Sequence, residues 1–160
     1  MVTIERTAVV PASPGDVWAV LAEFGDISRW ATNVDHSCLL SEQTEGIGTT
    51  RRIQTSRATV VETVEAWEPA SSVAYRITGL PRVVRSVTNT WRLVDDGAQT
   101  TVSLTTEVDA GPRPPQQLIA KAVGKRLASA SDQMLDGLTR HVGTPGATVA
   151  VPANATGAPA

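Results

Sequence analysis

The sequence predicts an α+β fold in which a curved antiparallel sheet of seven strands wraps around one long C-terminal helix. Two observations lead to it. One alternating segment at 2–10 and six further β segments between residues 34 and 109 are joined by short turns. A single helical stretch at 116–142 then carries one apolar stripe, which needs the face of the sheet as its partner.

The N-terminal elements follow from alternation and capping. Residues 2–10 alternate polar and apolar side chains, which is the pattern of a half-buried strand. Ser13 can cap a following helix, whose apolar face runs to Phe24. Asp26 can cap a second short helix over residues 27–31. The chain therefore begins with one strand and two helices.

The central part of the chain contains β segments near 34–41, 48–55, 58–67, 72–78, 83–94 and 99–109. Turn signals such as the sequence DDG at 95–97 separate them. Because successive strands are joined by short connections, we expect an antiparallel meander.

The long helix is expected to present the stripe Ile119, Val123, Leu127, Ala130, Met134, Leu138 and Val142 to the sheet. Only six residues of the chain are aromatic, and small residues lie on or beside this stripe. We expect the missing bulk to form a cavity between sheet and helix. A fully packed interior, with a composition set by a GC-rich genome, is the alternative.

Composition and charge limit the function classes. Residues 1–142 are expected to form one domain, and 143–160, rich in Ala, Gly, Pro and Thr, a disordered tail. No signal peptide or membrane-spanning run is recognisable, so we expect a cytoplasmic protein without integral membrane association. A net charge of −2 argues against a nucleic-acid or membrane-surface binder. The single cysteine, Cys38, excludes an internal disulfide and is expected to be a buried thiol.

Five short strings carry a resemblance to a known family: PASPGDVW (11–18), FGDISRW (24–30), GTTRRI (48–53), VVETVE (60–65) and TWRLVDDG (90–97). In this order and spacing they resemble the START-like helix-grip superfamily, also called SRPBCC, over residues 2–142. This superfamily includes polyketide cyclase/dehydrase-type proteins, pollen-allergen-type proteins and plant abscisic-acid receptors. The resemblance implies a cavity for a small hydrophobic molecule and no obligatory cofactor.

A charged pair is expected on the inner face of the sheet. A two-residue turn at Ser56-Arg57 would place Arg51 opposite Glu62. In the plant receptors that the chain resembles, the glutamate matching Glu62 lines the ligand pocket. The pair can therefore anchor a polar group of a ligand. It can equally be a cross-strand ion pair that fixes the register of the hairpin.

The expected ligand-binding residues are Arg51, Ile53, Val60, Glu62, Tyr75, Ile77, Ser86, Leu104, Val123, Leu127 and Met134. Glu62 and Tyr75 are also the candidates for acid/base chemistry. Tyr75 can instead be a core aromatic with a satisfied hydroxyl. Ser86 is included because its strand matches the pocket side of the receptors, although Val87 and Trp91 on the other face are more apolar. A bulge would reconcile the two faces.

No spacing of His, Cys and Asp residues is typical of a metal site, and no cofactor is expected. The leading interpretation is a protein, monomeric or homodimeric, that binds a small hydrophobic or amphipathic molecule such as a lipid, isoprenoid or polyketide. The second is a cyclase/dehydratase-type enzyme working in the same cavity. The third is a protein-interaction module that uses the tail or a surface around Trp67 and Trp91.

Overall fold

The computed structural model describes residues 1–143, and the expected tail lies outside them apart from Gly143, the last residue of the long helix. The strands are β1 (Val2–Val10), β2 (His36–Leu39), β3 (Thr50–Gln54), β4 (Thr59–Glu68), β5 (Ser72–Thr78), β6 (Ser86–Asp95) and β7 (Thr100–Asp109). The helices are α1 (Pro14–Ala22), the short 3-10 helix η1 (Phe24–Arg29) and α2 (Pro114–Gly143). The predicted order of elements is confirmed.

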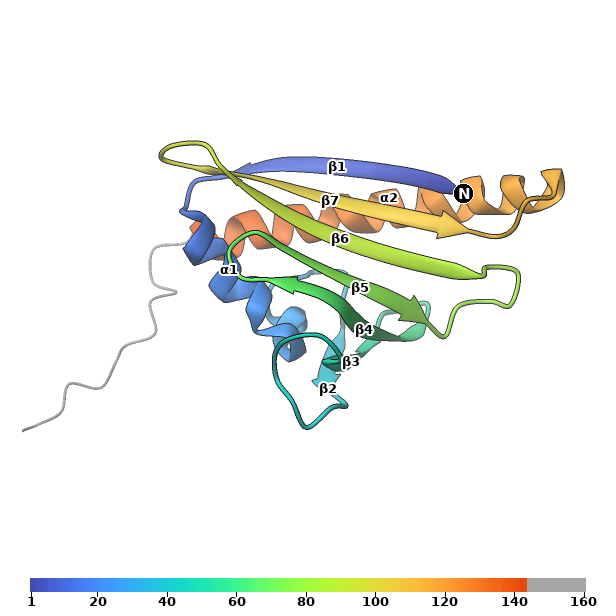
Figure 1. The fold of residues 1–160 in the computed structure, drawn as a ribbon, viewed down its shortest axis with the longest axis horizontal. Coiled ribbons are helices and arrows are strands. Elements are labelled where there is room, and N and C mark those ends of the chain that lie inside the picture. The colour runs from blue at the N-terminus through green and yellow to red at the C-terminus, as the bar shows by residue number, and fades with distance from the viewer. Residues whose placement is uncertain (144–160) are drawn as a thin grey trace, which may run out of the picture.

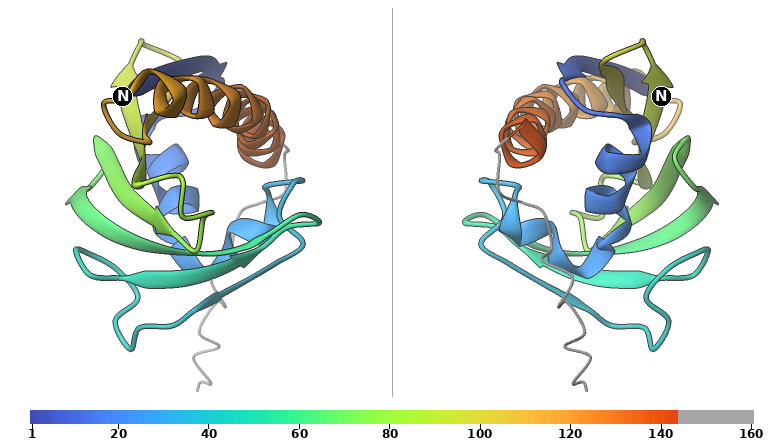
Figure 2. Two further views of the ribbon diagram at one scale, coloured as in Figure 1. Left: turned by 90° about the vertical axis from the view of Figure 1, so that its right-hand side faces the viewer. Right: turned by 90° about the vertical axis from the view of Figure 1, so that its left-hand side faces the viewer.

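The strands form one antiparallel sheet in the order β1-β7-β6-β5-β4-β3-β2. All connections after β2 join neighbouring strands, as the short turns predicted, and β1 closes the order by pairing with β7. The sheet curves around the inside of the molecule, and α2 crosses the opening beside β1 and β7 (Figures 1 and 2). This is the predicted helix-grip architecture.

The N-terminal helices close one end of the curved sheet (Figure 2). Ser13 caps α1 by accepting a hydrogen bond from the Asp16 backbone N–H at 3.2 Å. The second helix differs from the prediction of a helix over 27–31 capped by Asp26. It begins at Phe24, and Asp26 lies inside it with non-helical backbone angles. The chain therefore kinks where it passes over the inner face of the sheet.

The small residues of α2 do not leave a void, which corrects the expectation drawn from them. The buried face of α2 consists of Ala120, Gly124, Ala128, Ser131, Met134, Leu135, Gly137 and Leu138. A Cβ on Gly124 would lie 2.7 Å from Ile4 Cδ1 of β1, and one on Gly137 would overlap the Trp30 carbonyl oxygen. The small side chains therefore allow close packing of the helix against the sheet and the η1 segment. The predicted stripe is rotated, because Ile119, Val123 and Leu127 are only half-buried.

Strand β6 lacks the expected bulge, since its pairing with β5 and β7 runs without a break. The register shift lies in β4, between Val64 and Ala66. Along β6 the buried side chains are Val87, Asn89, Trp91 and Leu93. Ser86 alternates with them and lies on the other face, so its placement in the pocket was wrong.

The six aromatic residues gather into three edge-to-face pairs. Trp18 packs on Trp67 at 5.0 Å between ring centroids, Phe24 on Tyr75 at 5.6 Å, and Trp30 on Trp91 at 5.9 Å. Each pair joins the α1–η1 region to the sheet, so the scarce aromatic bulk is concentrated there. Trp91 is buried, which removes it from the surface on which the interaction-module interpretation placed it.

Candidate functional site

A row of buried polar side chains crosses the inner face of the sheet from β3 to β7. Its members, one from each successive strand, are Arg51, Glu62, Tyr75, Asn89 and Thr106, and none is more than 7% exposed. Strand register brings them together, because Arg51 lies opposite Glu62, Tyr75 opposite Asn89, and Asn89 opposite Thr106. Polar groups buried in this number need partners, and each has one.

The predicted hairpin places Arg51 and Glu62 as expected. Thr55 N–H donates to the Ala58 carbonyl oxygen at 2.9 Å, which closes the two-residue turn. The Thr55 hydroxyl oxygen also accepts from the backbone N–H groups of Arg57 and Ala58 at 3.3 and 3.1 Å. These bonds stabilise a turn whose Ser-Arg dipeptide is otherwise unfavourable. The register that follows pairs the two charges on the inner face.

Arg51 is held on three sides. Its Nε and Nη2 both lie on Glu62 Oε2, at 2.7 and 2.6 Å. Its Nη1 donates to the Phe24 carbonyl oxygen at 2.8 Å. The guanidinium carbon lies 3.7 Å from the centroid of the Phe24 ring and 4.9 Å from that of Tyr75. A cation between two aromatic rings and a carboxylate is stabilised in a place where an isolated charge would be costly.

The Tyr75 hydroxyl oxygen accepts two hydrogen bonds from β6. Trp91 Nε1 donates to it at 3.1 Å and Asn89 Nδ2 at 3.4 Å. The Asn89 amide is oriented by Thr106, whose hydroxyl donates to Asn89 Oδ1 at 2.7 Å. Both lone pairs of the phenol oxygen are thus used, and its own hydrogen is left to donate.

Burial raises the pKa of the Tyr75 phenol above its ordinary value, and the negative charge of Glu62 raises it further. Arg51 and the hydrogen bonds from Trp91 and Asn89 oppose that rise without cancelling it. The phenol is therefore protonated at neutral pH and is a hydrogen-bond donor.

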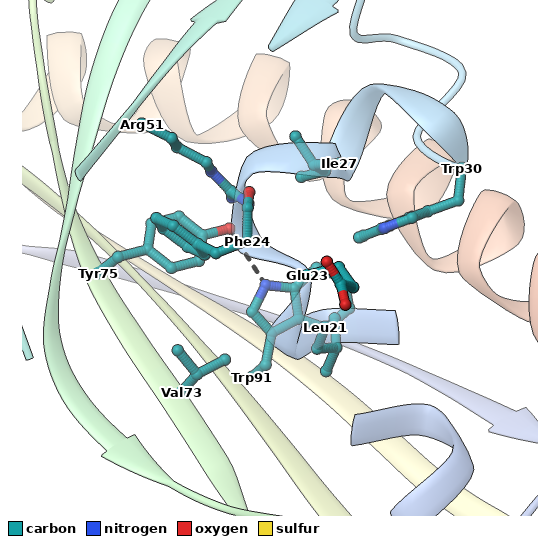
Figure 3. Close-up of a pocket in the computed structure, with 9 residues that line it drawn as sticks. All are labelled: Leu21, Glu23, Phe24, Ile27, Trp30, Arg51, Val73, Tyr75 and Trp91. Carbon is teal, nitrogen blue, oxygen red and sulfur yellow. Dashed lines mark hydrogen bonds between the residues drawn. The ribbon is translucent and has the colours of Figure 1, made fainter. Parts of the chain in front are cut away.

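The polar row borders a small pocket, shown in Figure 3, whose volume is about 10 Å³. Its walls are Leu21, Glu23, Phe24, Ile27, Trp30, Arg51, Val73, Tyr75 and Trp91. A space of this size accommodates roughly one water molecule, against ~300 Å³ or more for a typical ligand pocket. Phe24 and Trp30 form part of the wall on the side of the α1–η1 segment (Figure 3).

The structure brings only part of the predicted site to this pocket. Arg51 and Tyr75 line it, and Glu62 reaches it through Arg51. Ile53, Ile77, Leu104 and Met134 are buried in the surrounding core, whereas Val60, Val123 and Leu127 are half-buried at its margin. None of these seven side chains is among the nine that form the wall.

Sequence reasoning missed Asn89, Trp91, Phe24 and Trp30. The period-two pattern that joins Val87, Trp91 and Leu93 includes Asn89, so alternation alone could have found it. The contribution of Phe24 depends on the kinked path of η1, for which the sequence carries no clear signal.

Cys38 is exposed, which corrects the expected buried thiol. With Ser37 and Leu39 it borders an open groove of about 500 Å³ between β2 and the α1–η1 junction. Within residues 1–143, no three His, Cys, Asp or Glu side chains are grouped as metal ligands. No helix in that range is long and apolar enough to cross a membrane.

A family model described as "Polyketide cyclase / dehydrase and lipid transport" matches residues 1–143. Among curated protein sequences, no match is found.

Solved structures share the fold at low sequence identity. The ZhuI aromatase/cyclase from a Streptomyces species is 23% identical with a TM-score of 0.67, over 88% of this chain and 95% of that one. Ara h 8.0201 is 15% identical with a TM-score of 0.70, over 88% and 97%. The di-domain aromatase/cyclase StfQ of the steffimycin pathway is 14% identical with a TM-score of 0.74, over 89% of this chain and 50% of that one.

Proposed function

Because the chain belongs to the polyketide cyclase/dehydrase and lipid transport family, we propose that it binds a small amphipathic molecule between the sheet and the helices. The observation that carries the proposal is the buried polar row from Arg51 to Thr106, in whose middle the Tyr75 phenol hydrogen has no acceptor among residues 1–143. A core that served stability alone would gain little from these groups, since apolar residues of similar volume are often neutral or stabilising.

The ligand in this proposal has an apolar body and one oxygen acceptor, such as a carbonyl or hydroxyl group. The Tyr75 hydroxyl donates to that oxygen, and the Arg51 guanidinium, already neutralised by Glu62, lies beside it. The surrounding walls are mostly apolar and aromatic, which suits a fused-ring or isoprenoid body.

Binding requires the pocket to enlarge, because about 10 Å³ cannot hold such a molecule. The segment that must move is η1 with Phe24 and Trp30. It is kinked at Asp26, and Phe24 contacts Arg51 through its carbonyl oxygen and its ring. A ligand oxygen can replace the Phe24 carbonyl oxygen as acceptor of the Arg51 N–H. The described conformation is then the closed, unliganded state.

Native mass spectrometry of the purified chain, after incubation with a total organic extract of cells, tests this function. We expect one small-molecule adduct per chain. Tyr75→Phe removes the free donor and lowers the occupancy, whereas Trp67→Phe, at the half-buried Trp18–Trp67 pair outside the pocket, leaves it unchanged. Absence of any adduct, or an equal adduct in both variants, contradicts the proposal.

A second function, cyclase or dehydratase chemistry, is favoured by the same phenol hydrogen. The raised pKa of Tyr75 keeps it protonated, so it can polarise or protonate a carbonyl oxygen of a bound polyketide chain. Glu62, the other candidate, already accepts two bonds from Arg51 and serves to position it. If the chain is such an enzyme, Tyr75→Phe loses turnover of a polyketide substrate by more than it loses binding. Equal losses leave binding as the function.

A further inference from the structure

The positively charged residues of this protein are concentrated in two parts of the sequence that lack acidic residues, which the net charge of −2 does not reveal. Residues 69–94 and 110–131 contain eight Arg and Lys residues and no Asp or Glu. The first stretch includes the β5–β6 loop, and the second includes the β7–α2 connection and the first turns of α2. Sequence composition alone missed this, because it sums the charges over the whole chain.

The fold brings the β5–β6 loop of the first stretch and the β7–α2 connection of the second to one end of the molecule, whereas β5 and β6 run from there to the opposite end. The Arg85 backbone N–H donates to the Asp109 carbonyl oxygen at 2.7 Å, which ties the β5–β6 loop to the end of β7. The Arg85 guanidinium carbon lies 3.2 Å from where a Cβ on Gly111 would be. This end faces the viewer in the left panel of Figure 2. We call it the basic end, defined by the cations Arg57, Arg82, Arg85, Arg113, Lys121, Lys125 and Arg126.

All seven cations of the basic end are exposed, and within residues 1–143 none of them forms an ion pair. The acidic groups nearest along the chain are Asp109, whose Oδ1 accepts from the Gly111 N–H at 2.9 Å, Glu62, which binds Arg51, and Asp132, which pairs with Arg6. The opposite end, at the left of Figure 1, has Asp16 in α1, Glu68 at the end of β4, Asp95 at the end of β6 and Asp96 after it, against Arg140 and His141 in the last turn of α2. The molecule is therefore an electric dipole along its long axis.

Exposed apolar side chains accompany these cations. Leu118 in the first turns of α2 is 68% exposed, and Val83 in the β5–β6 loop is 52% exposed. Exposed prolines stand beside both, at positions 81, 112, 114 and 115. A nucleic-acid surface offers phosphates but no apolar layer for such side chains. An anionic bilayer offers both, because cations contact its headgroups while apolar side chains enter the interface.

We propose that the basic end docks the protein on the surface of an anionic lipid bilayer. The charge dipole turns this end toward the membrane, the seven cations bind the headgroups, and Leu118 and Val83 insert at the interface. This docking rests on the surface alone and holds whatever molecule the interior pocket takes.

Co-sedimentation with vesicles tests the proposal. We expect the full chain to bind vesicles of phosphatidylcholine mixed with phosphatidylglycerol, to bind pure phosphatidylcholine vesicles far more weakly, and to be released as NaCl is raised. The triple variant Arg82→Gln, Arg85→Gln, Arg113→Gln should lower the partition coefficient about 100-fold at low salt, because each cation near such a surface contributes roughly fivefold.

The matched control is the triple variant Arg29→Gln, Arg76→Gln, Arg92→Gln, which changes the net charge equally but removes exposed cations elsewhere. It should bind like the unchanged chain, and thermal melting checks that all variants are folded. Leu118→Gln should weaken binding at high salt several-fold, where insertion of apolar side chains predominates.

Three results would overturn the proposal. They are equal binding to both kinds of vesicle, an equal loss in the control variant, and the absence of vesicle binding, with or without salt-sensitive binding to duplex DNA. Such binding to DNA would assign the basic end to nucleic acid.

Discussion

At the scale of single residues, Arg51 organises the candidate site. It joins Glu62 of β4, the Phe24 carbonyl oxygen of η1 and two aromatic rings. The two interpretations of the Arg51–Glu62 pair left open by the sequence are compatible. The pair fixes the register of the β3–β4 hairpin and also presents a neutralised cation at the pocket.

The cost of breaking this pair is the first prediction. Arg51→Met leaves the Glu62 carboxylate buried without its partner, so we expect a loss of about 3–5 kcal/mol in the free energy of unfolding. The double variant Arg51→Met, Glu62→Met removes both charges and should recover most of that loss. Urea denaturation measures all three proteins.

The exposed pair Arg76–Glu65, with a separation of 2.7 Å, is the control for that experiment. Arg76→Met should cost at most about 1 kcal/mol, because both side chains are solvated. If Arg51→Met costs no more than this control, the buried pair is not the organising contact.

The second prediction uses the fact that Tyr75 is the only tyrosine of the chain. Phenolate absorbance at 295 nm therefore reports this group alone. Its pKa is raised in the folded state, so the stability that the protonated phenol contributes is present below about pH 10 and is lost as the pH rises above it.

We expect the phenol of the folded protein to be less than half ionised at pH 10, and the phenolate signal to rise at higher pH together with loss of the circular-dichroism signal. Tyr75→Phe should lose less stability than the unchanged chain over the same alkaline range. If the Tyr75 phenol ionises near pH 10 while the protein stays folded, its pKa is not raised by burial, and this account of the site is contradicted.

At the scale of elements, α2 depends on small residues for its position. Gly137 passes so close to the Trp30 carbonyl oxygen that no Cβ can be accommodated without movement. Since that oxygen belongs to the backbone beside η1, the α2–η1 contact fixes how closely this segment can approach the helix.

We therefore predict that Gly137→Ala lowers the free energy of unfolding by about 1–3 kcal/mol, although alanine is the better helix former. Gly15→Ala in α1 is the matched control, because its Cβ would meet only Ser13 Oγ, at an ordinary 3.8 Å. It should be neutral or stabilising by up to about 1 kcal/mol. Thermal or urea unfolding compares the two, and equal effects would contradict the proposed close packing.

The elements were largely predictable from the sequence, because strand alternation, turn residues and the Ser13 cap are local signals. The β3–β4 register was predictable too, since a two-residue turn determines which residues pair. The start of η1 was not, because its 3-10 turns have no side-chain cap and are fixed by contacts with the sheet. The buried face of α2 was not predictable from apolar periodicity. The most apolar stripe is not the face that lies closest to the sheet, because the closest contacts of the helix are made by glycine and alanine.

At the scale of the whole molecule, the fold separates two surfaces by position and charge. The polar row and its pocket lie inside, between the sheet and the α1–η1 segment. The basic end lies outside, at the loops beside the start of α2. The pocket is expected to bind a small molecule, and the basic end is expected to bind an anionic lipid surface. The two proposals are tested by substitutions at different residues, so each can fail without the other.

The central claim is that the interior binds a small amphipathic molecule after the η1 segment moves. The four tryptophans can report on this claim. Trp30 and Trp91 line the pocket, whereas Trp18 and Trp67 pack against each other and are not part of its wall. Fluorine NMR of 5-fluorotryptophan-labelled protein, with resonances assigned by single Trp→Phe variants, separates the two pairs.

We predict that addition of the organic extract used for mass spectrometry shifts the Trp30 and Trp91 resonances saturably and leaves those of Trp18 and Trp67 in place. Four unchanged resonances, or shifts confined to Trp18 and Trp67, would contradict the assignment of this interior as the binding site.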